Sequence, residues 1–482
     1  MYCSKRLFSK YETEAGLLPA AMSFVSRRPP ASGNASETGR SRRRRKLFIR
    51  TGPLSSVTSD ERRPNVVLIT SHDLGQHLGC YGVEAVDTPN LDDLAASGVQ
   101  FENAVASSPV CSPSRGSLLT GRYPQSNGLL GLTHSPWWWR LGDDEATLPQ
   151  LLGEEGYETH LTGLQHVAPD PGRLEFDHLH SLERDAEETA AAAGEIFADA
   201  GDEPIYAQFG FFETHRPLDR EPADEDGVYV PSYLRETEEM RADLARFQAE
   251  VEALDERVGE LLAGLEECGV REETIVVFAV DHGVPYPGAK WWCRDPGVEI
   301  SLLMDGPGPG FEASAPVEPV ISNVDVLPTL FDALDLPVPD RVEGVSFYDY
   351  LTGAAEDPPR EAAFTQYTSA GSESRGVVTA DHTLVRNFGA GRTVDYPVDV
   401  DPTSRGPSQG SAAEPRPYAQ LYDRTDDPYN VDDIAGDEPD TVSALSSRVR
   451  AWMARVDDPL LRGGVRYPYG ERATRDLLGA GE

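Results

Sequence analysis

Three short apolar runs constrain the fold of this chain more than any other feature. They are rich in β-branched and aromatic residues and span residues 65–70, 205–212 and 274–280. Such runs indicate strands that are buried on both faces, as in parallel sheets. Between the last two runs, apolar residues recur at spacings of three and four from Leu244 to Leu261, which predicts a long amphipathic helix. Buried strands that alternate with helices predict an α/β fold.

Ionisable residues follow each of these predicted strands directly. The three segments are His72-Asp73, Glu213-Thr214-His215 and Asp281-His282. Because open α/β sheets gather their ligand sites at the carboxyl ends of the strands, we expect these side chains to lie at one site. An acid beside an imidazole at a strand end favours a metal site. Two interpretations of His72 stay open: a ligand that favours Mn²⁺ or Zn²⁺, or a loop residue beside the metal.

The segment 110–122 carries a thiol, hydroxyls, a proline and an arginine ahead of a helical pattern that Gly121 closes. Pro113 suits the first turn of a helix. Cys111 would then lie at the helix N-terminus, where backbone N–H groups and the helix dipole favour an anion. Arg115, one turn further, can bind two oxygens of a tetrahedral oxyanion. The segment predicts an oxyanion site with a sulfur nucleophile, or a group made from it; the alternative is a buried structural cysteine before a capped helix.

The string Cys-x-Pro-Ser-Arg, followed by Leu-Thr-Gly-Arg, closely resembles the signature of the type I sulfatases. Further segments resemble the family in the same order, from about Pro64 to about Ala435. The stretch 127–134, the segment 284–287 and Tyr422-Asp423 are most similar to the heparan N-sulfatase (sulfamidase) branch. The resemblance implies that a formylglycine-generating enzyme oxidises Cys111 to Cα-formylglycine, whose hydrated aldehyde is the nucleophile. It also implies a sulfated sugar or other sulfated small molecule as substrate, with O-sulfate and N-sulfate both open.

The resemblance implies one divalent metal, with Ca²⁺ first and Mg²⁺, Mn²⁺ or Zn²⁺ as alternatives. The metal residues that it implies are Asp73, Asp281, His282 and His72, the last of which replaces a family aspartate. The catalytic residues that it implies are Cys111, Arg115, His166, His215 and Lys290. Arg115 orients the hydrated aldehyde, His215 and Lys290 hold the sulfate, and His166 takes a proton as sulfate leaves. Lys290 is the only lysine after residue 46. Leu164 stands where the family has a lysine that contacts the sulfate.

The fold that the resemblance implies is alkaline-phosphatase-like: a large mixed, mostly parallel sheet sandwiched by helices, with a smaller C-terminal α+β subdomain. We expect a disordered basic head over residues 1–60, a catalytic domain over 61–355 and the subdomain over 356–482. The head could equally arise from a translation start placed too far upstream. A hairpin over 377–386, a long loop over 395–416 and a helix over about 438–455 are expected in the last region.

Two other functions remain open at this point. One is a phosphodiesterase or phosphonate monoester hydrolase of the same superfamily, because Asp281-His282 suits it and some members share Cys-x-Pro-Ser-Arg. The other is a catalytically inactive protein that binds sulfated glycans, because the family lysine is absent at Leu164 and His72 replaces a family aspartate.

Charge is distributed unevenly along the chain. Residues 1–63 carry 14 basic and 5 acidic residues, whereas the remainder carries 29 basic and 76 acidic ones. This acidic, lysine-poor body resembles proteins of halophilic organisms and argues against a nucleic-acid partner. Five cysteines form no disulfide framework. No apolar run reaches 18 residues and no export signal is evident, so we predict a cytoplasmic protein without a membrane span.

Overall fold

The computed structural model describes residues 63–198, 201–222, 227–312, 315–389 and 416–477. The predicted head over 1–60, and the predicted long loop up to residue 415, lie outside the described residues. Among the described helices, none has the length and apolar character needed to cross a bilayer.

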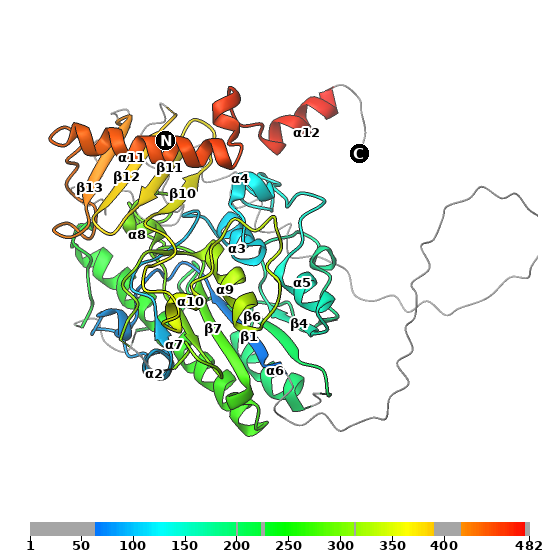
Figure 1. Ribbon diagram of the computed structural model, residues 1–482. Helices are drawn as coiled ribbons and strands as arrows, with labels where there is room; N and C mark the ends of the chain where they lie inside the picture. Colours follow the sequence, from blue (N-terminus) through cyan, green and yellow to red (C-terminus); the bar gives the residue numbers. More distant parts are fainter. Residues whose placement is uncertain (1–62, 199–200, 223–226, 313–314, 390–415, 478–482) are drawn as a thin grey trace, which may run out of the picture. The chain divides into compact units, whose positions relative to one another are not determined.

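A seven-stranded sheet forms the centre of the described chain (Figure 1). Its strands, in spatial order, are β2 (Val99–Gln100), β8 (Leu302–Asp305), β7 (Thr274–Val280), β1 (Asn65–Ser71), β6 (Ile205–Gly210), β4 (Glu158–Gly163) and β5 (His178–Leu179). The five strands from β7 to β5 are parallel, whereas β8 is antiparallel to β7 and β2 is antiparallel to β8. Every residue of β1, β6 and β7 is buried. The predicted mixed, mostly parallel sheet is confirmed.

Helices flank this sheet in two groups. One group contains α2 (Pro89–Ser97), α6 (Ala186–Ala198) and α7 (Glu238–Glu267), in which α2 and α6 both pack on α7. The other contains α3 (Cys111–Thr120), α5 (Leu148–Glu154) and α9 (Val326–Ala333), in which α5 and α9 both pack on α3. The apolar stripe of α7 is fully buried from Leu244 to Leu261, as its spacing predicts. The side chain of Thr237 caps this helix by accepting from the Met240 N–H at 3.1 Å.

The helix that begins at Cys111 is confirmed in its bounds. It starts after the extended residue Val110 and ends at Gly121, which has φ 62° and donates its N–H to the Ser117 carbonyl. A left-handed residue at this position favours glycine, since a Cβ would strain the backbone.

Residues 99–105 are divided between two short strands. β2 pairs with β8 in the central sheet, but β3 (Ala104–Val105) pairs with β9 (Ile321–Ser322) in a separate ladder. The chain turns at residues 102–103 because its two halves pair with different strands. The apolar pattern does not show this change of partner.

The C-terminal part of the described chain contains an antiparallel sheet of four strands. These are β10 (Ala363–Tyr367), β11 (Ser374–Val378), β12 (His382–Asn387) and β13 (Ala419–Asp423). Helix α11 (Pro439–Arg455) packs on β11 and β12 (Figure 1). The predicted hairpin and final long helix are therefore confirmed, whereas the boundary at residue 356 stays a prediction. At the end of this region, the fully buried Arg375 guanidinium donates to both carboxylate oxygens of Asp458, at 2.6 and 3.1 Å.

Candidate active site

Backbone hydrogen bonds bring the ends of three central strands together. The Asp281 N–H donates to the backbone carbonyl of Ser71 at 3.3 Å. The His72 N–H donates to the backbone carbonyl of Glu213 at 2.9 Å, and the Thr214 N–H donates to the backbone carbonyl of His72 at 3.0 Å. The ionisable segments after β1, β6 and β7 therefore meet at one place, as their positions at strand ends predict.

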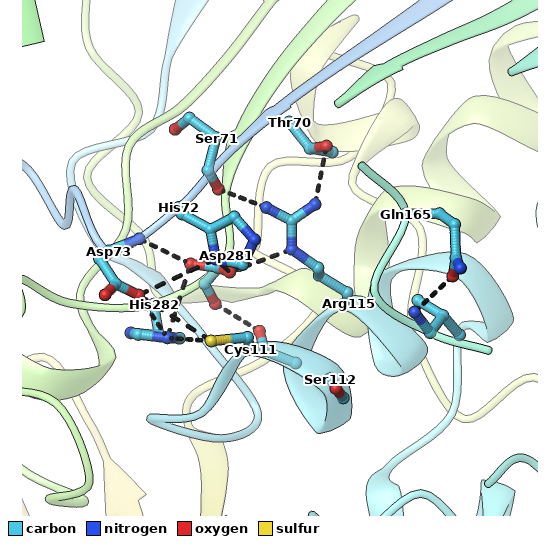
Figure 2. Close-up of polar contacts among 12 residues, drawn as sticks. Thr70, Ser71, His72, Asp73, Cys111, Ser112, Arg115, Gln165, Asp281 and His282 are labelled. Atoms are coloured by element: carbon cyan, nitrogen blue, oxygen red, sulfur yellow. Dashed lines mark hydrogen bonds and ion pairs between the residues drawn. The ribbon is translucent and has the colours of Figure 1, made fainter. Parts of the chain in front are cut away.

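Two carboxylates and two imidazoles form the centre of the site (Figure 2). His72 Nδ1 lies 2.8 Å from an Asp281 oxygen, and His282 Nε2 lies 3.0 Å from an Asp73 oxygen. The backbone N–H of Asp73 also donates to the Asp281 carboxylate at 3.0 Å. All four side chains are at most 1% exposed. Such a concentration of buried ionisable groups is typical of a catalytic or metal site.

Cys111 points into this centre from the first residue of α3 (Figure 2). Its Sγ lies 3.2 Å from His282 Nε2 and 3.9 Å from an Asp73 oxygen. The helix start is held in place by Ser114, whose hydroxyl donates to the Asp281 carbonyl at 2.5 Å and accepts from Asn323 at 2.8 Å. The thiol is therefore fixed against the acid–imidazole group rather than placed in an apolar pocket.

Arg115 occupies a different position from the one that its spacing suggests. Its guanidinium donates to the Asp281 carboxylate at 3.0 Å, the Thr70 hydroxyl at 3.0 Å and the Ser71 carbonyl at 2.9 Å. All three acceptors belong to the ends of β1 and β7, and the residue is 2% exposed. In this structure Arg115 uses three of its five N–H groups to orient Asp281 and to join α3 to the sheet.

Lys290 reaches the other carboxylate. Its Nζ donates to Asp73 at 2.5 Å, and the residue is 7% exposed. Although burial alone would lower the pKa of Lys290, the Asp73 carboxylate raises it above the ordinary value. Burial would raise the pKa of Asp73, but Lys290, His215 and His282 together hold it well below the usual range. Each buried carboxylate thus has its own cation, Lys290 or Arg115.

The remaining predicted histidines border this centre. The His72 ring lies 5.6 Å from that of His166 and 5.3 Å from that of His215, between centroids. Burial lowers the pKa of all three, and that of His72 to about 3. Neutral imidazoles are therefore expected near pH 7, and these can accept protons.

Two of these residues hold backbone conformations that side chains other than glycine rarely adopt. Asp73 has φ 49° and His166 has φ 51°. Such positions cost on the order of 1–3 kcal/mol and persist where the surrounding structure fixes them, often at functional sites. Asp73 follows β1 and His166 follows β4, and each has a donor atom within 4.8 Å of Cys111 Sγ.

Sequence reasoning missed two residues at the rim of the site. His134 lies 5.4 Å from the His166 ring and 5.0 Å from the Trp137 ring, between centroids. The Arg184 guanidinium lies 4.2 Å above the Phe212 ring, which in turn lies 4.9 Å from the His215 ring. The sulfamidase-like stretch 127–134 ends at His134 and could have indicated it. Arg184 lies 18 residues after His166 and outside the motifs that the sequence offers, so no neighbouring residues indicate its place at the site.

The residues of the centre suit a divalent cation. Donor atoms of His72, Asp73, Cys111 and Asp281 lie within 4.8 Å of one another. His72 Nε2 is buried and has no hydrogen-bond partner among the described residues. Two carboxylates with imidazole nitrogen provide both charge and a mixed oxygen and nitrogen donor set. Three of the four predicted metal residues belong to this group, and the fourth, His282, contacts Asp73 and Cys111 through its Nε2.

The model of the sulfatase family matches residues 64–336, which is more than half of the chain. The chain belongs to the sulfatase family. Human N-sulphoglucosamine sulphohydrolase is 28% identical to it over 464 residues, covering 83% of this chain and 91% of the human protein. The enzyme is accordingly a sulfuric ester hydrolase.

Solved structures share the fold. A 2-O GAG sulfatase superposes with a TM-score of 0.67 at 20% identity, covering 84% of this chain and 95% of that one. The phosphonate monoester hydrolase of Agrobacterium radiobacter gives a TM-score of 0.65 at 20% identity, covering 82% of this chain and 96% of that one. Because both similarities are of fold alone, they do not separate sulfur from phosphorus chemistry.

Proposed function

We propose that this sulfatase removes sulfate from a sugar, as an ester or a sulfamate, by means of formylglycine made from Cys111 and one divalent cation. The observation that carries this proposal is the position of Cys111 Sγ. It lies at a helix N-terminus, 3.2 Å from His282 Nε2 and 3.9 Å from the Asp73 carboxylate. An inert structural cysteine would lie among apolar side chains.

Asp73, Asp281, His282 and His72 are the residues that would hold the cation. Formylglycine would supply the attacking oxygen, and the cation would draw negative charge from the sulfate group. We keep Ca²⁺ as the first candidate on family grounds, although two imidazoles in the donor set also suit Mn²⁺ or Zn²⁺.

The cationic side chains of the site have separate tasks in this proposal. Arg115 uses its guanidinium to keep the Asp281 carboxylate in place. Lys290, on the Asp73 side, offers an ammonium that can also meet a sulfate oxygen as charge develops there. Burial holds the pKa of His166 well below its ordinary value, so the ring is neutral near pH 7, and its Nδ1 has no hydrogen-bond partner among the described residues and is available as the site of protonation. His215 is a second candidate for proton transfer, to the leaving group.

The rim supports a sulfated sugar as the substrate. Trp137 is 39% exposed and packs beside His134, which adjoins His166. Exposed aromatic faces of this kind stack on sugar rings. Arg184 adds a guanidinium close to Phe212 and His215, and it makes no ion pair with a carboxylate among the described residues. We propose that Arg184 supplies a positive charge for sulfate binding in a chain whose family lysine is replaced by Leu164. The relatives named for N-sulphoglucosamine and for a 2-O GAG fit this substrate class.

The deciding experiment is the mass of the peptide that contains Cys111, from protein made in its own host. A lighter, aldehyde-reactive peptide is expected, followed by sulfate release from N-sulfated or O-sulfated glucosamine. An unmodified thiol in active protein would contradict the formylglycine mechanism. Faster turnover of an aryl phosphate diester than of an aryl sulfate would contradict the sulfate specificity.

A further inference from the structure

The histidines of this chain gather in two separate places. All ten lie within the described residues. Five belong to the active site or its rim, namely His72, His134, His166, His215 and His282. Three others, His160, His178 and His180, lie together at the edge of the central sheet. The proposed reaction uses none of these three.

Strand register places this second group on one face of the sheet. β5 is the edge strand and pairs in parallel with β4, with His160 opposite His178. Side chains two residues apart in a strand point to the same face, so Glu158 joins His160, and His180 extends the face beyond His178. β4 ends at Gly163 and His166 follows three residues later, so the edge group and the active site lie at different points of one connected segment.

Three donor atoms converge at this edge. A Glu158 oxygen lies 2.7 Å from His178 Nε2 and 3.7 Å from His160 Nε2. The donor atoms of these three residues lie within 4.8 Å of one another. Ligand atoms on a tetrahedral ion are about 3.3 Å apart when each lies ~2.0 Å from it. Only a small adjustment of exposed side chains is therefore needed to close on an ion.

His160 provides the second, independent observation. The residue is only 7% exposed, and its Nε2 is buried without a hydrogen-bond partner among the described residues. Its other ring nitrogen, Nδ1, lies 3.0 Å from His180 Nε2. If Nδ1–H donates to His180, the lone pair of His160 Nε2 is left free, 3.7 Å from the Glu158 oxygen, while the His178 ring stacks on the His160 ring with centroids 4.6 Å apart. A ring held in this way by a second group is typical of a histidine that binds metal.

The chemistry of the donors selects the class of ion. Two imidazole nitrogens and one carboxylate suit Zn²⁺ and its neighbours in the first transition series, whereas Ca²⁺ and Mg²⁺ require more oxygen ligands. The His178 side chain is 50% exposed and that of Glu158 is 34% exposed, so an ion can enter from solvent and keep water as a further ligand.

We propose that Glu158, His160 and His178 form a second metal site, for Zn²⁺ or a similar transition-metal ion, with His180 orienting His160. The site would fasten the two-residue strand β5 to β4. It would thereby stabilise the connection between His166 and Arg184, both of which border the active site. The proposal does not depend on the activity of the enzyme.

The test compares Zn²⁺ binding by the full chain and by three variants, with calorimetry for stoichiometry and Co²⁺ absorption for ligand type. His178→Ala and Glu158→Gln alter exposed or half-buried side chains, so both should fold. Each should bind one Zn²⁺ fewer per chain than the parent and should lose a visible Co²⁺ band. His180→Ala should keep the site but weaken its affinity by roughly 10–100-fold, as for other residues that orient a ligand.

His382→Ala is the matched control, because His382 is partly buried and belongs to neither histidine group. It should bind as many ions as the parent. Sulfatase turnover should be unchanged in His178→Ala, which separates this site from the catalytic cation. Equal Zn²⁺ stoichiometry and affinity in the parent, His178→Ala and Glu158→Gln would overturn the proposal.

Discussion

The two histidine groups of this enzyme differ in how their charges are compensated. In the active site, two carboxylates that are at most 1% exposed are each paired with a cation, Lys290 or Arg115. At the sheet edge, one carboxylate that is 34% exposed faces His160 and His178 and has no lysine or arginine partner among the described residues. At the sheet edge, solvent can stabilise the charge of the carboxylate, whereas in the active site buried cations must do so.

The difference also concerns how each group is assembled. Three strand ends and the start of α3 converge on the active site, so each functional side chain is fixed by several independent segments. The edge group depends on one ladder, in which β5 contributes only His178 and Leu179. A substitution in the first region should therefore disturb chemistry and stability together, whereas a substitution in the second should change metal binding alone. Four predictions, from the largest effect to the smallest, test this contrast.

Cys111→Ala should abolish turnover, with a loss of at least about 10⁴-fold, because the group that attacks sulfur is removed. Steady-state sulfate release measures the loss, and circular dichroism should show an unchanged fold. Cys293→Ala is the control, since Cys293 is buried outside the site and should be dispensable for turnover. Zn²⁺ binding at the edge should persist in Cys111→Ala. Clear residual sulfate release by this variant would refute the assigned nucleophile.

Asp281→Asn should lower both turnover and stability, because it leaves the buried Arg115 without its charged partner. Breaking a buried pair in this way costs roughly 3–5 kcal/mol. Glu158→Gln, the corresponding change at the edge, should cost about 1 kcal/mol or less without added metal, since the pair is partly solvated. Denaturant unfolding of both variants measures the contrast. Equal losses of stability would show that the two regions do not differ in charge compensation.

His77 lies outside both histidine groups, and it tests how a buried histidine makes the free energy of unfolding depend on pH. Burial lowers its pKa to about 4, and its ring packs on Phe247 and Tyr229. The His77 imidazole takes up a proton near pH 6.5 in the unfolded chain but only near pH 4 in the folded chain. Its contribution to the free energy of unfolding is therefore full above pH 6.5 and is lost as the pH falls to 4. It amounts to about 3 kcal/mol. His77→Phe should flatten the fall of unfolding free energy over this interval; an unchanged slope would exclude His77 as its source.

Zn²⁺ at about 100 times its dissociation constant should stabilise the parent by about 2.7 kcal/mol through the edge site. His178→Ala should lose that increment while matching the parent in metal-free buffer. Thermal unfolding with and without Zn²⁺ gives both values, and His382→Ala should behave as the parent. If Zn²⁺ stabilises His178→Ala as much as the parent, the stabilisation comes from Zn²⁺ bound at the active site instead.

Much of the active site could be predicted from sequence because its signals are local. The strands β1, β6 and β7 each carry ionisable residues within three positions of their ends, and the Cys111 segment carries its own helix signals. The contacts of Arg115 could not be predicted, because they depend on which strand ends lie beside α3. The same holds for the edge group: His160 and His178 are 18 residues apart, and only the register of β4 with β5 brings them together. The division of residues 99–105 between two ladders has the same non-local cause.

The buried contact between Arg375 and Asp458 has a consequence for the modularity of the chain. The Asp458 carboxylate also accepts from Gln125 at 2.9 Å, and Gln125 lies just after the helix that begins with Cys111. One carboxylate thus ties the C-terminal sheet, the end of α11 and the catalytic segment to one another. Exchanging the C-terminal region, which carries both Arg375 and Asp458, for that of a relative would leave the Gln125 amide without its acceptor unless residues 125 and 458 were kept as a pair. The C-terminal sheet is therefore joined to the segment after α3 by a shared carboxylate, although each sheet packs on its own core.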